Sequence, residues 1–468
     1  MTAPALTHLH VLKLPFMPAD SLFETFFEQD HAVGFLSDGS KLGRWSWLCA
    51  HADAISVLEY TDKRSPETVL RAAMAVTHYQ TSEIAGDGGE LPPFTGGLVG
   101  LAAFELGMRL ENLPQRPFRI EGRNPWPELI CLRFPALLAF DHKQRRLLAL
   151  GRGRDGVEAY NRAVGMQKLL HQCLSRTHHT TPQPILRAPL ALETADEVHE
   201  DKVATLVQQI HAGDLFQANL ARGWQGQLSD GMTIGRVTRA LGRQGASPFG
   251  AVFRLQKRAV ISNSPERFIR LDADGKLETR PIKGTRPRGK TPAADAAFAK
   301  ALSASEKDRA ENLMIVDLMR HDLSKVAEVG SVKVEALNAL ESYPNVHHLV
   351  STVTAQLRPE CDAGDVLLNT FPPGSISGAP KVQALKVIQA LEAPRGPYCG
   401  SLFWVDVGGA MDSSVLIRTA VCEQDDKNRW QVRLCAGGGI VADSDPKEER
   451  RETETKISLL KAVFEGSG

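Results

Sequence analysis

Strand-like and helix-like segments follow one another in irregular order along this 468-residue chain, which restricts the folds open to it. Short apolar runs bounded by turn residues, the pattern of β-strands, occur at Gly43–Cys49 and Glu128–Phe140. Apolar residues spaced three and four apart in Val198–Ile210 indicate an amphipathic helix, and strand patterns return in Phe249–Thr279. This mixed order favours an α+β fold.

The second part of the chain continues the mixture, and a change of composition precedes it. The patterns predict helices at 305–326, 379–391 and 447–464 and strands at 405–421 and 430–434. Residues 176–190 are rich in His, Thr and Pro, too polar and too often interrupted for a regular element. We therefore predict a sheet-rich N-terminal half at 1–175, a linker at 176–190 and a second half at 191–468.

Charge and cysteine content exclude several classes of function. Lys plus Arg and Asp plus Glu both number 55, so no bulk field exists to hold nucleic acid or an anionic membrane. The chain has no run of about 18 apolar residues, and its N-terminus lacks the pattern of a signal peptide, which predicts a cytoplasmic protein. Seven scattered cysteines without a CxxC pair argue against a disulfide framework or a zinc site.

The octapeptide Pro281–Arg288 (PIKGTRPR) places an amine, two guanidiniums and a glycine on what we predict to be a short turn. A lysine is nucleophilic only when deprotonated, and burial or neighbouring cations such as Arg286 and Arg288 favour that state. Gly284 can adopt a positive φ and let a ligand approach the backbone. We predict a site for a small polyanion with Lys283 as its reactive group, the alternative being a solvated basic loop.

Two pairs of carboxylates lie three residues apart on predicted helices: Asp308 with Glu311, and Glu449 with Glu452. This spacing places both members of a pair on one helix face, where they repel unless a cation lies between them. Mg²⁺ fits such a position because it takes one or two carboxylates plus waters and substrate oxygens. The alternative is two solvated helix faces.

Three further features can bind anions. Ser375 and Gly378 precede a predicted helix whose first-turn N–H groups can hold a carboxylate. Arg418 can bind a carboxylate through a bidentate fork that lysine cannot reproduce. A run of three glycines can present consecutive N–H groups to a second carboxylate: Gly437, Gly438 and Gly439.

Six blocks resemble, in order, segments of the chorismate-utilising enzymes, a family that includes anthranilate, aminodeoxychorismate, isochorismate and salicylate synthases. The blocks are Gly213–Ala221 (GDLFQANLA), Asn263–Phe268 (NSPERF), Glu311–Val326, Val346–Val353, Phe371–Lys381 and Ala436–Lys456. The resemblance is strong from about Glu197 onward and weaker before it. It implies a sandwich of large, mostly antiparallel sheets with helices outside and the site between two halves.

The resemblance also implies roles for single residues. It makes Lys283 the nucleophile at C2 of chorismate, Glu266 a general acid or base, and His348 the residue facing the departing C4 hydroxyl. A carboxyl in a partly closed site beside other acids has a raised pKa, which suits Glu266 to proton transfer. The implied metal-binding acids are Glu311 and Glu452, supported by Asp308 and Glu449. The implied substrate contacts are Ser375, Gly378, Tyr398, Arg418, Gly437, Gly438, Gly439 and Lys456.

The third residue of the octapeptide separates two branches of the family: PIAGT is usual in anthranilate synthases and PIKGT in bacterial-type aminodeoxychorismate synthases. Lys283 therefore implies component I of the second branch, which replaces the C4 hydroxyl of chorismate with an amine for p-aminobenzoate and folate synthesis. Gln217 stands where isochorismate and salicylate synthases carry a lysine base. The alternatives are anthranilate synthase component I and a non-catalytic regulatory homologue, and the presence of Glu266, Glu311 and Glu452 argues against the latter.

The nitrogen of such a reaction is expected to come from a partner. A glutaminase needs a cysteine nucleophile on a glycine-flanked turn with a downstream histidine. Cys399 is the only cysteine beside a glycine that loosely fits this pattern, and it lies in a block of the chorismate-utilising type. We therefore expect chorismate and ammonia as substrates, Mg²⁺ as cofactor and a separate glutamine amidotransferase subunit.

Overall fold

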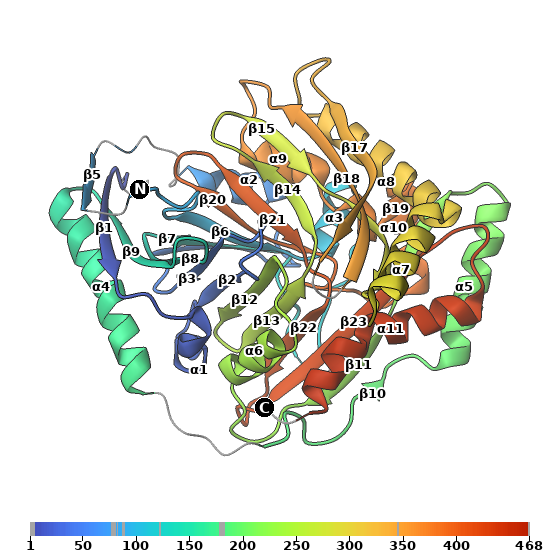
Figure 1. The fold of residues 1–468 in the computed structure, drawn as a ribbon, viewed down its shortest axis with the longest axis horizontal. Helices are drawn as coiled ribbons and strands as arrows, with labels where there is room; N and C mark the ends of the chain where they lie inside the picture. Colours follow the sequence, from blue (N-terminus) through green and yellow to red (C-terminus); the bar gives the residue numbers. More distant parts are fainter. Residues whose placement is uncertain are drawn as a thin grey trace.

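Two large β-sheets pack face to face and form one α+β body (Figure 1). The structure, a computed structural model, describes residues 5–75, 81, 83–86, 89–120, 123–176, 183–343 and 346–466. Trp47 in one sheet and Trp404 in the other meet with ring centroids 5.9 Å apart, within a shared apolar core. Among the described strands every long pairing is antiparallel except that of the first with the fifth. The sandwich that the sequence predicted is confirmed.

The larger sheet has 13 strands. In spatial order they are β10 (Ala191–Leu192), β11 (Gln217–Gln227), β23 (Trp430–Ile440), β22 (Thr419–Gln424), β13 (Arg258–Ser264), β12 (Phe249–Leu255), β2 (Val33–Leu36), β3 (Trp45–Cys49), β8 (Ala136–Asp141), β9 (Arg146–Gly153), β1 (His8–Leu14) and β5 (Glu83–Gly86), with β19 (Gly378–Ala379) paired to β11.

The smaller sheet has 10 strands. Their order is β16 (Ile282–Pro287), β18 (Val346–Gln356), β15 (Lys276–Thr279), β14 (Arg267–Leu271), β21 (Met411–Val415), β20 (Ser401–Asp406), β6 (Gly97–Ala102), β7 (Leu129–Phe134) and β4 (Ala54–Leu58), with β17 (Lys333–Ser342) paired to β18.

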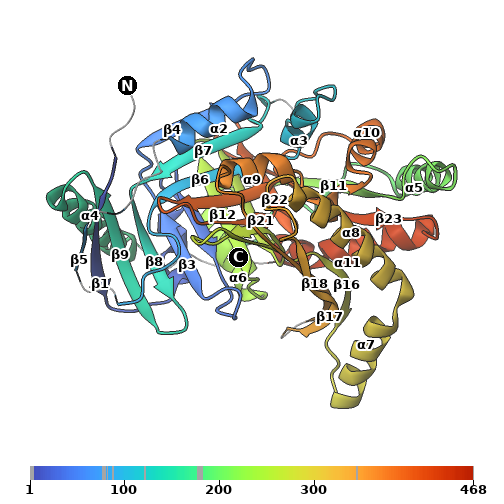
Figure 2. The ribbon, with the colours of Figure 1, turned by 90° about the horizontal axis from the view of Figure 1, so that it is seen from above.

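The described helices lie outside the sandwich. They are η1 (Ala19–Leu22), α1 (Phe23–Phe26), α2 (Pro66–Met74), α3 (Glu105–Leu110), α4 (Gly156–Ser175), α5 (Asp196–His211), α6 (Ile234–Arg243), α7 (Pro292–Ala304), α8 (Glu306–Ser324), α9 (Ala363–Thr370), η2 (Gly374–Ile376), α10 (Lys381–Leu391) and α11 (Pro446–Phe464). None of these described helices is long and apolar enough to cross a membrane. Figures 1 and 2 show α4 beside β1 and β9 at one end, and α5, α7, α8, α10 and α11 at the other.

Side-chain caps fix where the two acid-bearing helices begin. Ser305 accepts a hydrogen bond from the Asp308 N–H at the start of α8. Asp445 accepts from the N–H groups of Lys447 and Glu448 at the start of α11. Such caps satisfy first-turn N–H groups that have no partner inside the helix. The predicted helices 305–326 and 447–464 are therefore confirmed almost to the residue, whereas α4 and α7 carry no prediction from the sequence.

Both sheets contain strands from both sides of the predicted 176–190 boundary. The strands before it supply β1, β2, β3, β5, β8 and β9 to the larger sheet and β4, β6 and β7 to the smaller one. Of the predicted linker, 177–182 lie outside the described residues. Ile185 beyond them is buried, its N–H donates to the Gly466 carbonyl at 3.3 Å, and Leu186 forms a bridge with Leu228. The two predicted halves thus share one β framework.

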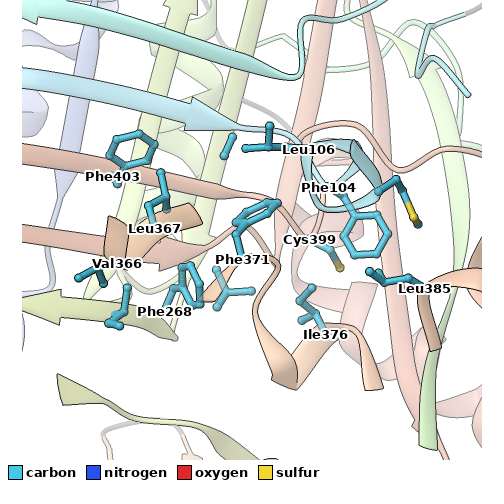
Figure 3. Packing of buried hydrophobic residues seen from close by; sticks show 14 of the residues in the cluster. Phe104, Leu106, Phe268, Val366, Leu367, Phe371, Ile376, Leu385, Cys399 and Phe403 are labelled. Carbon is cyan, nitrogen blue, oxygen red and sulfur yellow. The ribbon is translucent and has the colours of Figure 1, made fainter. Parts of the chain in front are cut away.

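An apolar cluster supports the loop between α9 and α10. Phe371 and Ile376 project from this loop into the core, and the Phe371 ring lies 6.2 Å from that of Phe268 on β14 (Figure 3). Close packing of this kind leaves little freedom to move. It fixes the loop beside the segment joining β13 to β14, which carries Glu266.

Arg395 is a fully buried cation that ties four segments together. Its Nε and Nη2 each donate to the Glu392 carboxylate at 2.9 Å. Nη1 donates to the Ile376 carbonyl at 3.0 Å and Nη2 to the Asn219 carbonyl of β11 at 2.8 Å. The Glu105 carboxylate accepts from the Arg395 N–H at 2.7 Å. This network joins α3, the end of α10, β11 and the η2 loop.

We predict that Arg395→Met lowers the free energy of unfolding by about 3–5 kcal/mol, because it leaves the Glu392 charge buried without its cation. Urea unfolding against Arg451→Met, an exposed arginine on α11, measures the difference. The double variant Arg395→Met/Glu392→Gln should lose less than the sum of the two single variants. A loss for Arg395→Met no larger than that of the exposed control would contradict this reading.

Candidate active site

The octapeptide forms a strand and not the turn that the sequence predicted. β16 pairs with β18 along Ile282–Pro287, with a bulge between Lys283 and Thr285. Gly284 in this bulge has φ = +72°, and a Cβ there would lie 2.8 Å from Leu302 and 2.9 Å from Asp308. Only glycine takes this conformation at so close an approach without strain. The bulge turns Lys283 toward the loop that carries Ser375.

Lys283 lies among acids. Its side chain is 10% exposed, and its Nζ lies 4.0 Å from Glu311 Oε2 and 3.5 Å from the Ser375 carbonyl, to which it donates. The expectation that Arg286 and Arg288 flank it is wrong, because each arginine is paired elsewhere. Arg286 donates to Asp308 at 3.2 Å and Arg288 donates to Asp295 at 2.8 Å. Carboxylates, not guanidiniums, surround the amine.

Glu266 lies in the short link between β13 and β14 and is buried. Burial raises the pKa of Glu266 to about 7, while a hydrogen bond from Ser375 and the charge of Lys283 oppose the rise. A carboxyl that titrates near neutrality can both release and accept a proton there. The raised pKa expected from the sequence is confirmed, and Glu266, Lys283 and Ser375 lie together.

His348 is buried on β18 opposite β16. One ring nitrogen, Nδ1, lies 2.9 Å from the Thr285 hydroxyl. Burial lowers the pKa of His348 to about 4, with a further contribution from the charge of Arg418. The ring is therefore neutral at neutral pH. Its neighbour His347 joins Asp295 of α7 at 2.9 Å to Ser342 of β17 at 2.8 Å.

Tyr398 lies in the loop before β20, and Arg418 lies in the loop between β21 and β22. Arg418 has φ = +50°, and burial lowers its pKa. Among the described residues its guanidinium has no carboxylate partner. A half-buried cation without an anion is suited to an anionic ligand. Burial raises the pKa of Tyr398 far above its usual range, so its hydroxyl stays protonated.

Ser375 and Gly378 precede α10, as the sequence predicted, and neither lies in its first turn. Ser375 belongs to η2 and Gly378 to β19, while α10 begins only at Lys381. Lys381 is buried and donates to Asp322 at 2.6 Å and to the Thr370 and Pro372 carbonyls at 2.7 and 2.9 Å. Lys381 therefore fixes the loop that presents Ser375, a role that sequence reasoning missed.

Each of the four predicted metal-binding acids has a basic partner. Glu449 lies 3.3 Å from Lys307 Nζ, Glu311 4.0 Å from Lys283, Glu452 2.6 Å from Lys456 and Asp308 3.2 Å from Arg286. Burial raises the pKa of Glu311. Burial also acts to raise the pKa of Glu452, but Lys456, Lys307 and Lys283 together outweigh it and the pKa falls. In the part of the chain that the structure describes, no three such residues are placed to hold one metal ion.

The three glycines of β23 pass directly beneath this acid set. A Cβ at Gly438 would lie 3.0 Å from Glu449 Oε2 and 3.5 Å from Glu452 Oε1, and one at Gly439 would lie 3.3 Å from Lys283 Nζ. Gly437 pairs with Ala221, and its carbonyl accepts from Lys456 at 2.8 Å. The sequence predicted that the N–H groups of these three glycines bind one carboxylate. Successive N–H groups of a strand point to opposite edges of that strand, so the three groups do not converge on one point. The glycines instead leave room beside the acids and the lysine.

Gln217 lies next to Gly439 and is buried, and its Oε1 has no hydrogen-bond partner in the described structure. An amide cannot take up a proton at neutral pH, so the position offers no base.

A family model described as chorismate binding enzyme matches residues 35–462. The chain belongs to this family. The site assembled above therefore lies in a chorismate binding enzyme, on the face where β16, β23, α8 and α11 meet.

Similar relatives include aminodeoxychorismate synthases and anthranilate synthases. Aminodeoxychorismate synthase component 1 of Klebsiella aerogenes is 39% identical over 410 residues, 86% of this chain and 86% of that protein. Aminodeoxychorismate synthase of Streptomyces griseus is 34% identical over 471 residues, 96% of this chain, but the match spans only 63% of that longer protein. Anthranilate synthase component 1 of Streptomyces coelicolor is 38% identical over 415 residues, 85% of this chain and 77% of that protein.

A solved structure supports the fold assignment. Anthranilate synthase component I from Streptococcus pneumoniae TIGR4 superposes with a TM-score of 0.72 at 27% identity, covering 90% of this chain and 93% of that one.

The pKa of Glu266 gives a prediction that needs no substrate. Its folded value of about 7 exceeds the ordinary value of 4.5, so the protonated side chain stabilises the fold fully below about pH 4.5. This contribution is lost as the pH rises through about 7. The stability of wild type relative to Glu266→Gln should therefore fall by on the order of 3 kcal/mol between about pH 5 and about pH 8.

Urea unfolding of both proteins at the two pH values measures this difference. Glu448→Gln, which removes an exposed carboxyl of α11, serves as control. If wild type and Glu266→Gln changed in parallel with pH, the Glu266 carboxyl would not be the buried, protonated group described here.

Proposed function

We propose that the chain is an aminodeoxychorismate synthase component I, which replaces the C4 hydroxyl of chorismate with an amine. The observation that carries this proposal is Lys283, the lysine of the PIKGT octapeptide, placed 4.0 Å from Glu311 and beside Ser375 and Glu266. Relatives named aminodeoxychorismate synthase component 1, 38–40% identical over most of the chain, support it.

In this proposal Lys283 attacks C2 of the ring while the C4 hydroxyl leaves. Glu266 transfers protons near neutrality, and the neutral His348 ring faces the departing hydroxyl. Ammonia then adds at C4 and expels the lysine. Arg418, which lacks a carboxylate partner among the described residues, binds one substrate carboxylate in a bidentate fork. The other substrate contacts in this proposal are Tyr398, Ser375, Gly378, Lys456 and the β23 glycines.

Mg²⁺ is the proposed cofactor. One feature of the acidic residues fits a bound cation. Glu449 Oε2 is buried and has no hydrogen-bond partner in the described structure, as expected of an oxygen left for a cation. Glu311 and Glu452 would hold the ion, with Glu449 and Asp308 in support. When bound, the ion would neutralise a carboxylate of chorismate and orient the ring.

Ammonia is proposed to come from a separate glutamine amidotransferase subunit. The seven cysteines are buried or, for Cys361, half-buried. Burial raises the pKa of Cys399, the one glycine-flanked candidate, to about 11. A cysteine works as a nucleophile in its thiolate form, so Cys399 is poorly suited to hydrolyse glutamine.

Anthranilate synthase component I is the second candidate, supported by relatives of that name at 36–38% identity. It aminates C2 and then releases pyruvate. Lys283 argues against it, because that branch usually carries alanine at this position of the octapeptide.

One experiment separates these reactions and also tests the partner. Purified chain is incubated with chorismate, Mg²⁺ and either ammonium or glutamine at alkaline pH, and products are identified by mass spectrometry with a parallel pyruvate assay. We expect 4-amino-4-deoxychorismate without pyruvate from ammonium, and no amination from glutamine until a small amidotransferase subunit is added.

If the products were anthranilate and equimolar pyruvate, the chain would be an anthranilate synthase component I and the proposed activity would be wrong. Glutamine-dependent amination by the chain alone would contradict the two-subunit proposal.

A further inference from the structure

Lys307, the second residue of α8, faces the acid set but has no part in the reaction proposed above. Its Nζ lies 3.3 Å from Glu449 Oε1. The charges of Glu311 and Glu452 act on the same ammonium. Lys307 is thus a basic side chain shared by three of the four site carboxylates.

The two partners of this ion pair differ in their freedom to move. The side chain of Lys307 is 49% exposed, whereas that of Glu449 is 4% exposed. Glu449 is also held by the Ser444 hydroxyl, which donates to its Oε1 at 2.6 Å. A long, half-exposed lysine can move its ammonium into water at little cost, but a buried glutamate cannot follow.

The other oxygen of Glu449 is free. Oε2 is buried without a hydrogen-bond partner in the described part of the chain, and it borders the backbone of Gly438. A Cβ at Gly438 would lie 3.0 Å from this oxygen and 3.5 Å from Glu452 Oε1. The missing side chain therefore leaves a small space between two carboxylates, beside the ammonium of Lys307.

We propose that Lys307 is an internal counter-cation, which holds the Glu449 carboxylate while the site lacks metal and moves into solvent when a divalent cation binds. An ammonium and a metal ion compete for the same carboxylate oxygens, so Lys307 weakens metal binding while it stabilises the metal-free fold. The inference rests on the proposed Mg²⁺ site. It also gives a reason why the described acids are turned toward their basic partners and form no group of three around one point.

The test is calorimetric titration of the full chain with Mg²⁺ alone, without chorismate. Lys307→Met removes the competing charge and should bind Mg²⁺ roughly threefold or more tightly than wild type. Lys307→Gln should show the same gain, and Lys307→Arg, which keeps the charge, should bind as wild type does. Lys300→Met, at an exposed position of α7, controls for a general change in charge.

A second measurement uses the wild-type chain. Limited acetylation followed by peptide mass spectrometry reports how accessible each lysine is. Saturating Mg²⁺ should increase the labelling of Lys307, which loses its carboxylate partner, and leave Lys300 unchanged.

The outcomes are distinguishable. If the wild type binds Mg²⁺ and Lys307→Met binds it no more tightly, the role of Lys307 is overturned and the metal site stands. The same holds if Mg²⁺ binds the wild type but leaves the labelling of Lys307 unchanged. Absence of Mg²⁺ binding in wild type and Lys307→Met alike would overturn both. Binding seen in Lys307→Met alone would support the inference.

Discussion

A carboxylate taken out of water needs a nearby cation or a bound proton, and this requirement organises the site. Glu311, Glu449, Glu452 and Asp308 each have a lysine or arginine within 4.0 Å, from four different basic residues. Removing the cation from a buried carboxylate such as Glu311 or Glu449 leaves a buried charge that costs several kcal/mol, whereas Glu452 and Lys456 form a half-exposed pair. The nucleophile proposed here, Lys283, is therefore also a structural counter-ion. Reaction chemistry and charge balance are carried by the same side chains.

The fold brings these charges together through features with no polar chemistry of their own. A bulge at Gly284 directs Lys283 inward, and the glycines of β23 keep the floor of the site free of side chains. Two buried ion pairs away from the reacting groups, Arg395–Glu392 and Lys381–Asp322, hold the loop that carries Ser375. The position of Ser375 in the site thus depends on these two ion pairs, which do not contact the reacting groups.

Local patterns predicted the elements better than their contacts. The helices that carry Glu311 and Glu452 follow from the residue patterns, and the importance of Lys283 and Glu266 follows from their sequence blocks. The sequence could not show that Arg286 and Arg288 turn toward Asp308 and Asp295, because strand pairing decides which way a side chain points. It also could not reveal Lys307 and Lys381, whose carboxylate partners lie 142 and 59 positions away. Nor could it reveal Arg395, which also binds groups in three other segments. The predicted division at 176–190 rests on composition. Composition does not reveal that strands from before and after this segment pair in the same sheets.

Covalent trapping at Lys283 tests the central claim most directly. Wild-type chain and Lys283→Ala are mixed with chorismate and Mg²⁺ without ammonium, quenched, digested and analysed by mass spectrometry. A mass derived from chorismate on the wild-type peptide containing Lys283, absent from the variant, is the predicted result. If no adduct formed on a preparation that aminates chorismate once ammonium is added, ammonia would attack the ring directly and Lys283 would serve only as a counter-ion.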